Sequence, residues 1–347
     1  MTFTVDEEEV LDQINVLPDE ILIYIFKCLP LDSLLNCEKV CKRWEELARD
    51  PALWRRIVIV YSGKQGQTEV SEKNLEIILS HKEYIQCLKI QYMYIYSVIK
   101  FVIDQCENLI SLELVMCRIG KDFEYDILKW PNLKKLNLRN SILLSSNIDL
   151  MVPFENFCHL QYLALSDFGL SSLNCDSLLG CNYLTHILIE KIKGLGLEFI
   201  NKLILSKQKI IKTLHIYGGN SINDYTLKLL SNCVSLNDLA IVRCENLTDK
   251  GFISLTQLNN LQHLQIWNNN NFTETGILQV LGSPSIKQLK SLSLSRIQNV
   301  TPVSVDLLSE YYKNLKFLAL YHCPKIIHTD YEKQLKSKFR NIDVVLY

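Results

Sequence analysis

The stretch LISLELVMC, residues 109–117, decides the fold, because its apolar residues follow the pattern L-x-x-L-x-L. The same pattern returns along the chain every 24 to 28 residues. It begins at Ile85, Leu109, Leu133, Leu160, Leu184, Ile211, Leu236, Leu261, Leu289, Leu315 and Phe339, which we number as units 1 to 11. Alternating apolar residues indicate a short strand in each unit, and the segment before Leu109, SVIKFVIDQC, has helical spacing. The sequence therefore predicts a stack of strand and helix units.

Six of the twelve cysteines hold fixed places in this repeat. Cys106, Cys181 and Cys233 lie three residues before a unit start, and Cys117, Cys244 and Cys323 lie eight residues after one. Such regular places are typical of small core side chains. Cys37 and Cys41 would face one way on a helix, but no second pair or nearby His completes a zinc site. We therefore expect no metal, and a reducing compartment.

The period and the pattern resemble leucine-rich repeats, and the segments ENLTDKGF and NFTETGIL resemble their cysteine-containing class. This resemblance implies an α/β fold for residues 85–347. The expected shape is a curved solenoid with a parallel β-sheet on the concave face and helices on the convex face. Residues 54–59, WRRIVI, are predicted to supply a capping strand. A connecting and capping unit, residues 57–84, would then join the solenoid to the N-terminal part without a flexible linker.

Residues 17–56 show three short helical patterns. Pro18 suits a first helical position, and the apolar residues after it recur at helical spacing: Ile21, Leu22, Ile25, Phe26 and Leu29. Asp32 is predicted to cap a second helix, and residues 40–48 form a third that Asp50-Pro51 stops. A unit of about 40 residues with apolar side chains on more than one helical face needs the rest of the chain or a partner to cover it.

The opening Leu17-Pro18-Asp19-Glu20, the central Val40-Cys41-Lys42-Arg43-Trp44 and the closing Leu53-Trp54 resemble an F-box, which we assign to residues 16–56. Glu38 and Lys39 depart from the family, where many members carry small or apolar residues. Residues 1–15 are expected to be an acidic tail. The resemblance implies a Skp-type adaptor as partner, and through it a cullin and a RING subunit. The expected adaptor-binding residues are Leu17, Pro18, Ile21, Leu22, Ile25, Phe26, Leu29, Leu34, Val40 and Trp44.

The alternation within each strand predicts which side chains a target would meet. Positions four and six of a unit face the core, so positions three, five and seven face the concave surface. Aromatic and histidine side chains gather there, and we expect target contacts at Tyr162, His186, His215, Tyr217, His263, Trp267, Phe317 and Tyr321. The alternative is that these rings stack on their neighbours and only shield the sheet. The run NNNN at residues 268–271 is either a turn on the same rim or a further contact for a partner.

Composition narrows the classes of function. A net charge of −1 over 347 residues, without a concentrated basic stripe, argues against nucleic acid as a partner. Neither a secretory signal nor an apolar run long enough for a membrane occurs, so we expect a cytoplasmic or nuclear protein whose Asn246, Asn271 and Asn299 sequons stay unmodified. The common phosphate-binding and catalytic motifs are missing, so we expect neither an enzyme nor a cofactor.

Taken together, the two halves resemble F-box proteins with leucine-rich repeats. The resemblance implies a non-catalytic substrate receptor of a SKP-cullin-F-box type ubiquitin ligase, in which the repeats hold a target protein near the activated ubiquitin. One alternative is a scaffold or inhibitor that binds the adaptor without delivering a target. Another is a small-molecule co-receptor like those of plant relatives, which needs a basic concave floor. Only Lys89, Lys135 and Arg139 are basic in the concave positions, which argues against this last alternative.

Overall fold

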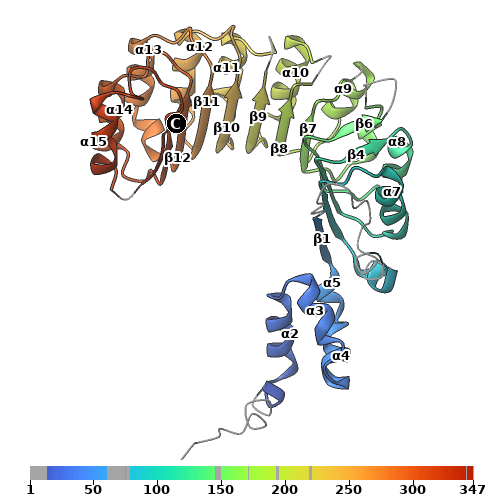
Figure 1. The fold of residues 1–347 in the computed structure, drawn as a ribbon. Helices are drawn as coiled ribbons and strands as arrows, with labels where there is room; N and C mark the ends of the chain where they lie inside the picture. The colour runs from blue at the N-terminus through green and yellow to red at the C-terminus, as the bar shows by residue number, and fades with distance from the viewer. Residues whose placement is uncertain are drawn as a thin grey trace, which may run out of the picture.

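Figure 1 shows the protein as a computed structural model in which a small group of helices precedes a long curved solenoid. The structure describes residues 14–60, 75, 79–144, 150–170, 172–192, 195–218, 221–340 and 342–346. Residues 1–13 of the predicted acidic tail and much of the connecting unit predicted for residues 57–84 therefore lie outside the described residues.

The N-terminal unit consists of helices α2 (Asp19–Lys27), α3 (Leu31–Cys37), α4 (Lys42–Ala48) and α5 (Pro51–Trp54). Pro18 is the N-cap of α2 and not its first helical residue. Pro30 precedes α3, and its carbonyl accepts the first backbone hydrogen bonds of that helix. Asp32 lies inside the first turn, so the predicted capping role of Asp32 is wrong. Asp50 does cap a helix, because its side chain accepts a hydrogen bond from the backbone N–H of Ala52 at 2.8 Å, at the start of α5.

In the described part of the chain, twelve parallel strands form one sheet in chain order, which lines the inside of the arc in Figure 1. They are β1 (Arg56–Val60), β2 (Cys87–Gln91), β3 (Ser111–Val115), β5 (Lys135–Leu138), β7 (Tyr162–Ser166), β8 (His186–Glu190), β9 (Thr213–Tyr217), β10 (Asp238–Val242), β11 (His263–Trp267), β12 (Ser291–Ser295), β13 (Phe317–Ala319) and β14 (Asp343–Val345). Two short strands, β4 (Arg118–Gly120) and β6 (Ile142–Leu144), pair separately. The predicted curved α/β solenoid is confirmed.

The strands begin two residues after the predicted start in units 1 to 10. Unit 11 differs, because Phe317 of β13 pairs with Asp343 of β14, four residues after the predicted start. The start at Phe339 is therefore wrong by two residues, and Phe339 instead ends helix α15 with its side chain buried. Side chains at positions four and six are buried in units 1 to 10, as the alternation predicts.

Helices cover the outside of the arc (Figure 1). They are α7 (Tyr96–Gln105), α8 (Phe123–Asp126), α9 (Ser172–Leu179), α10 (Leu197–Lys207), α11 (Asp224–Leu230), α12 (Asp249–Ser254), α13 (Glu274–Leu281), α14 (Pro302–Tyr311) and α15 (Asp330–Lys338). Short 3-10 turns complete the units: η1 (Lys82–Tyr84), η2 (Ile127–Lys129), η3 (Phe154–Asn156), η4 (Leu255–Gln257) and η5 (Pro284–Gln288). All twelve cysteines are free thiols, and the six at fixed repeat positions are buried in the core.

Capping residues connect successive convex helices. Asp224, the first residue of α11, accepts hydrogen bonds from the backbone N–H and the hydroxyl of Thr248, at 2.8 and 2.6 Å. Thr248 in turn is the N-cap of α12, and Asp249 of α12 accepts the same two bonds from Thr273, the N-cap of α13. The Thr-Asp and Thr-Glu pairs within ENLTDKGF and NFTETGIL thus form a chain of bonds that fixes the spacing of neighbouring helices.

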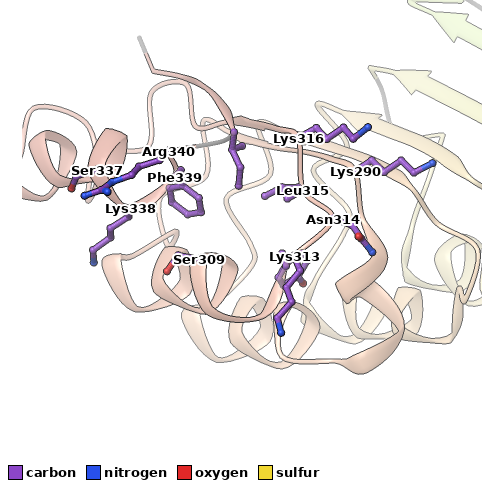
Figure 2. Close-up of a pocket in the computed structure, with 12 residues that line it drawn as sticks. Lys290, Ser309, Lys313, Asn314, Leu315, Lys316, Ser337, Lys338, Phe339 and Arg340 are labelled. Carbon is purple, nitrogen blue, oxygen red and sulfur yellow. The ribbon is translucent and has the colours of Figure 1, made fainter.

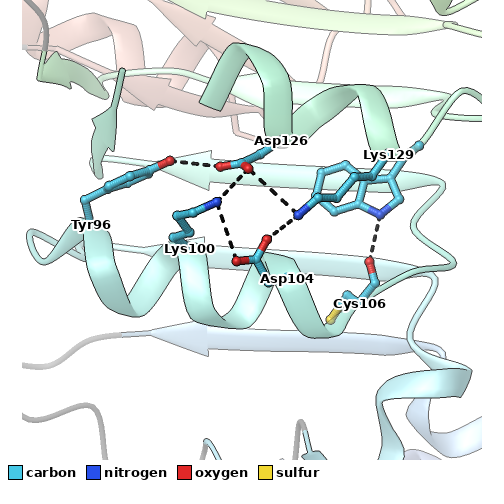
Figure 3. Close-up of polar contacts among 7 residues, drawn as sticks. Tyr96, Lys100, Asp104, Cys106, Asp126 and Lys129 are labelled. Atoms are coloured by element: carbon cyan, nitrogen blue, oxygen red, sulfur yellow. Dashed lines mark hydrogen bonds and ion pairs between the residues drawn. The ribbon is translucent and has the colours of Figure 1, made fainter. Parts of the chain in front are cut away.

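A charged network connects the convex sides of units 1 and 2 (Figure 3). The buried carboxylate of Asp126 accepts hydrogen bonds from the Tyr96 hydroxyl at 3.0 Å and from Lys100 Nζ at 2.7 Å. Lys129 forms ion pairs with Asp104 and Asp126, and its hydrogen bond to Asp104 lowers the pKa of that carboxyl. Because every charge in the network has a partner, we assign it to stabilisation of the solenoid.

The N-terminal helices join the solenoid through a buried stacking contact. The Trp54 ring lies on the imidazole of His81 with their centroids 3.5 Å apart, and both side chains are buried. His81 Nε2 also lies 3.2 Å from Glu38 Oε1. Burial lowers the pKa of His81, and the neighbouring Glu38 opposes that effect. Glu38, which departs from the F-box pattern, thus contributes to a junction in which helices and repeats share one core.

Candidate functional site

One face of α2 presents apolar side chains to solvent. Ile21 and Ile25 are 46% and 41% exposed, and Pro18 at the helix start is exposed as well. Their spacing of three and four residues places them in one stripe. Tyr24, which is 69% exposed, borders the stripe and was not among the predicted residues, although its spacing from Ile21 could have indicated it. Val40 lies in the turn before α4 and is also exposed.

Three of the predicted adaptor-binding residues are buried within the helical unit. Leu22, Phe26 and Leu34 are at most 4% exposed. Phe26 packs against the Trp44 ring with centroids 5.0 Å apart. The prediction that Leu22, Phe26 and Leu34 face a partner is therefore corrected, because their side chains hold the helices together. The partly buried Leu29 and Trp44 pack against the same core.

Arg43 fixes the segment that leads into α2. Its guanidinium donates hydrogen bonds to the carbonyl of Leu17 at 2.6 Å and to the carboxylate of Asp19 at 2.6 Å. A further bond goes from the guanidinium to the carbonyl of Asn15. These bonds hold the half-buried Leu17 and the exposed Pro18 beside the stripe of Ile21 and Ile25.

The concave face carries two separate groups of rings. In the first, Tyr162 stacks on His186 with centroids 6.0 Å apart, and Lys135 Nζ lies 4.8 Å from the centre of the Tyr162 ring. Burial lowers the pKa of His186. Lys135 also pairs with Glu113 at 2.7 Å. Burial alone would raise the pKa of Glu113, but the hydrogen bonds from Lys135 and from Asn137 outweigh it and lower that pKa.

The second group lies at the C-terminal half of the arc. Trp267 and Tyr321 meet edge to face with centroids 6.0 Å apart, although β12 lies between their strands. They can meet because β12 has only serines on this face, and Trp267 Nε1 donates a hydrogen bond to Ser293 Oγ at 2.6 Å. Both residues remain partly exposed. The rings thus stack on neighbours, as the alternative interpretation expects, and still offer surface to a partner.

The remaining predicted target residues lie near the second group. His215 Nε2 is 2.9 Å from Asp238 Oδ1, and the His215 ring meets the Tyr217 ring edge to face at 6.3 Å. His263 and Phe317 lie half-buried at the first position of β11 and β13.

Position eight of each unit, which lies just beyond the strand, departs from strand geometry. Its φ is positive in all ten units from Ile85 to Leu315, between 49° and 91°. The ten residues are Tyr92, Met116, Asn140, Asp167, Lys191, Gly218, Arg243, Asn268, Arg296 and His322. In a continued strand this side chain would point to the core, but the left-handed conformation turns it onto the rim of the concave face.

In units 5 to 9 this rim encloses a hollow of about 370 Å³, which we call the rim pocket. Its residues come from positions seven and eight of these units: Glu190, Lys191, Tyr217, Gly218, Val242, Arg243, Trp267, Asn268 and Arg296. Trp267 and Tyr217 were predicted as contacts, whereas the three basic residues were not. The earlier count of basic residues was limited to positions three, five and seven, so it missed the cations on this rim.

The asparagines of residues 268–271 have two different roles. Asn269 is buried and donates a hydrogen bond to the carbonyl of Trp267 at 3.2 Å, and Asn271 donates one to the carbonyl of Glu245 at 2.6 Å. Both therefore stabilise the turn, while Asn268 lines the rim pocket.

A larger and more open hollow of about 650 Å³ lies at the opposite edge of the last units (Figure 2). Lys290 and Lys316 point together to one side, whereas Lys313 and Arg340 point in other directions. Lys338 pairs with Asp306. Because these basic side chains do not converge on one point, we rank this hollow below the rim pocket as a binding site.

Comparison with known proteins agrees with both halves of the chain. Residues 14–60 match the family model named F-box-like. The chain is 24% identical over 214 residues to F-box protein SKIP19 of Arabidopsis thaliana, an alignment covering 52% of this chain and 70% of that protein. It is 34% identical over 73 residues to F-box/LRR-repeat protein 5 of Danio rerio, covering 18% of this chain and 11% of that one.

The whole solenoid also has a relative among solved structures. A chain in the crystal structure of the Rad7 and Elc1 complex in yeast superposes with a TM-score of 0.60 at 14% identity, covering 99% of this chain and 98% of that one. The fold is therefore shared over the full length. The N-terminal residues thus form an F-box-like domain, and the chain as a whole is similar to proteins named F-box/LRR-repeat proteins. Among the described residues, no helix has the length and apolar character needed to cross a bilayer.

Proposed function

We propose that this chain is the substrate-recognition subunit of a SKP-cullin-F-box type ubiquitin ligase. The exposed stripe of α2, with Leu17, Pro18, Ile21, Ile25 and Val40, binds a Skp-type adaptor, which brings a cullin and a RING subunit. The concave face holds the target protein. In this proposal the chain is not an enzyme and its side chains perform no chemistry. It speeds ubiquitin transfer by holding the target close to the activated thioester.

The observation that carries this proposal is the exposed apolar stripe on a unit that shares a buried core with the solenoid. The stripe is exposed although the same helix buries Leu22 and Phe26 on its other face, so it is surplus to the fold. The buried stack of Trp54 on His81 supports the proposal, because it ties the helices that carry the stripe to the solenoid. Because six cysteines occupy buried core positions of the repeat, we also propose a reducing compartment, either cytoplasm or nucleus.

The adaptor contact is tested with the double variant Ile21→Ala and Ile25→Ala. Each side chain is already about half buried, so covering the remainder contributes about 1 kcal/mol per residue, and the pair about thirtyfold in affinity. We expect the variant to stay folded and to lose adaptor and cullin on affinity purification. A matched control is Tyr125→Ala with Val234→Ala, which are 74% and 68% exposed on other surfaces. Unchanged recovery of the adaptor by the α2 variant would refute the proposal.

The target contact is tested with Trp267→Ala and Tyr321→Ala in cells. Truncated aromatic anchors commonly cost about 2 kcal/mol or more in binding, so the variant should keep the adaptor and lose captured target proteins. The Tyr125 and Val234 variant again serves as the control. If wild-type chain captures proteins that never gain ubiquitin, the alternative of a scaffold or inhibitor is correct instead.

A further inference from the structure

The rim pocket has an excess of positive charge. Lys191, Arg243 and Arg296 line it together with a single carboxylate, Glu190. Lys191 Nζ lies 3.9 Å from Glu190 and 3.7 Å from Asp167, so this cation has acidic neighbours. Arg243 and Arg296 are exposed, and neither forms an ion pair with any carboxylate in the described part of the chain. Two guanidinium groups therefore remain for a ligand.

Backbone bonds hold these cations in place. The N–H of Arg243 donates to the carbonyl of Trp267 at 2.9 Å, and the N–H of Arg296 donates to the carbonyl of Tyr321 at 2.7 Å. Each arginine is thus fixed to the next repeat unit in its left-handed conformation. Their strands are separated by one other, so their Cα atoms lie about 10 Å apart, a distance that two long side chains can close around one anion.

Beneath the cations lies an uncharged floor. It is formed by Tyr217, Val242 and Trp267 at position seven of three successive strands. Burial raises the pKa of Tyr217, so its phenol stays neutral at physiological pH. Gly218 adds no side chain between Lys191 and Arg243, and a Cβ placed there would meet nothing within 4 Å, so the floor is open to a ligand from that side.

We propose that the rim pocket recognises a segment of the target protein that carries an oxyanion, either a carboxylate or a phosphate, beside an apolar side chain. The anion lies between Arg243 and Arg296, and the apolar side chain rests on Trp267 and Tyr217. This inference rests on the proposed function and adds the chemical class of the recognised segment. Guanidinium groups suit both anions because they donate paired hydrogen bonds to two oxygens at once.

The experiment measures binding of the full-length chain, with its adaptor, to three degenerate peptide libraries. Their fixed central residue is phosphoserine, glutamate or serine, and the flanking positions are random. The variant is Arg243→Asn with Arg296→Asn, because Asn tolerates the left-handed conformation and already occupies this position at Asn268. The matched control is Lys290→Gln with Lys316→Gln, which removes the same charge at the opposite edge of the sheet.

We expect the phosphoserine or glutamate library to bind roughly ten to a hundred times more tightly than the serine library, and the arginine variant to lose that preference. If only the phosphoserine library binds more tightly than the serine library, the recognised anion is a phosphate. If the phosphoserine and glutamate libraries bind equally tightly, the pocket accepts either anion. Equal binding of all three libraries, or an arginine variant that behaves like the control, would overturn the inference. If the arginine variant keeps its target in cells while the Trp267 and Tyr321 variant loses it, only this inference fails. If both variants keep the target, the proposed function of the concave face fails too.

Discussion

Replacing Gly276 by Ala tests how closely the convex helices pack. Gly276 is the third residue of α13, where Ala normally stabilises a helix by about 1 kcal/mol relative to Gly. Here, however, a Cβ would overlap the carboxylate of Asp249 in α12. That carboxylate accepts hydrogen bonds from the backbone N–H of Thr273, at 2.8 Å, and from its hydroxyl. To make room, Asp249 must rotate and give up both bonds.

The net effect follows from these opposing contributions. Overpacking costs about 1 to 3 kcal/mol, and two charge-assisted bonds at a partly exposed site contribute about 1 to 2 kcal/mol. Against these stands the gain of about 1 kcal/mol in helix propensity. We therefore expect Gly276→Ala to lower the free energy of unfolding by about 1 to 4 kcal/mol. Urea unfolding followed by circular dichroism, with an unchanged slope against denaturant, measures this change.

A double-mutant cycle provides the control. In an Asp249→Ala background the neighbouring side chain is too short to collide, so Gly276→Ala should now stabilise the protein. Gly251→Ala should behave differently, because its Cβ would also lie 2.8 Å from the backbone Cα of Asp224, which no side-chain truncation removes. The reasoning would be refuted if Gly276→Ala stabilised the wild-type chain or changed its stability equally in both backgrounds.

Three further predictions concern the junction, the adaptor surface and the thiols. Burial holds the pKa of His81 below its ordinary 6.5, so the contribution of His81 to stability should be complete above pH 6.5 and should fall as the pH drops toward the pKa of His81 in the folded protein. His81→Gln should flatten this pH dependence of the melting temperature. Arg43→Ala should free the segment around Leu17 and weaken adaptor binding roughly three- to tenfold in calorimetry, with little change in melting temperature. A thiol reagent at pH 7.5 should label three cysteines of the native chain quickly, and mass spectrometry should identify them as Cys28, Cys41 and Cys158.

Much of the fold could be predicted because ten units of the chain carry the same apolar pattern. Where a segment occurs once, the sequence leaves more than one solution. At the C-terminus, the apolar residues Phe339, Ile342 and Val344 fit a start at Phe339, but the pairing of β14 with β13 places the start two residues later, at a polar residue. On α2, Ile21 and Leu22 are adjacent apolar residues, and helical spacing alone does not say which of them faces the core. Packing of Phe26 on Trp44 makes the Leu22 side the buried one.

The cations of the rim pocket escaped prediction for a different reason, which lies in the backbone. The rule that successive side chains alternate holds only while φ stays extended, and at position eight φ becomes positive in each of ten units. Each turn is stabilised by its neighbours, since in most units the N–H of position eight donates to a carbonyl of the adjacent unit. A side chain there, such as Arg243, consequently joins the concave surface beside Trp267 instead of the core. For this chain, position eight of each unit therefore belongs with positions three, five and seven in any account of what the solenoid binds.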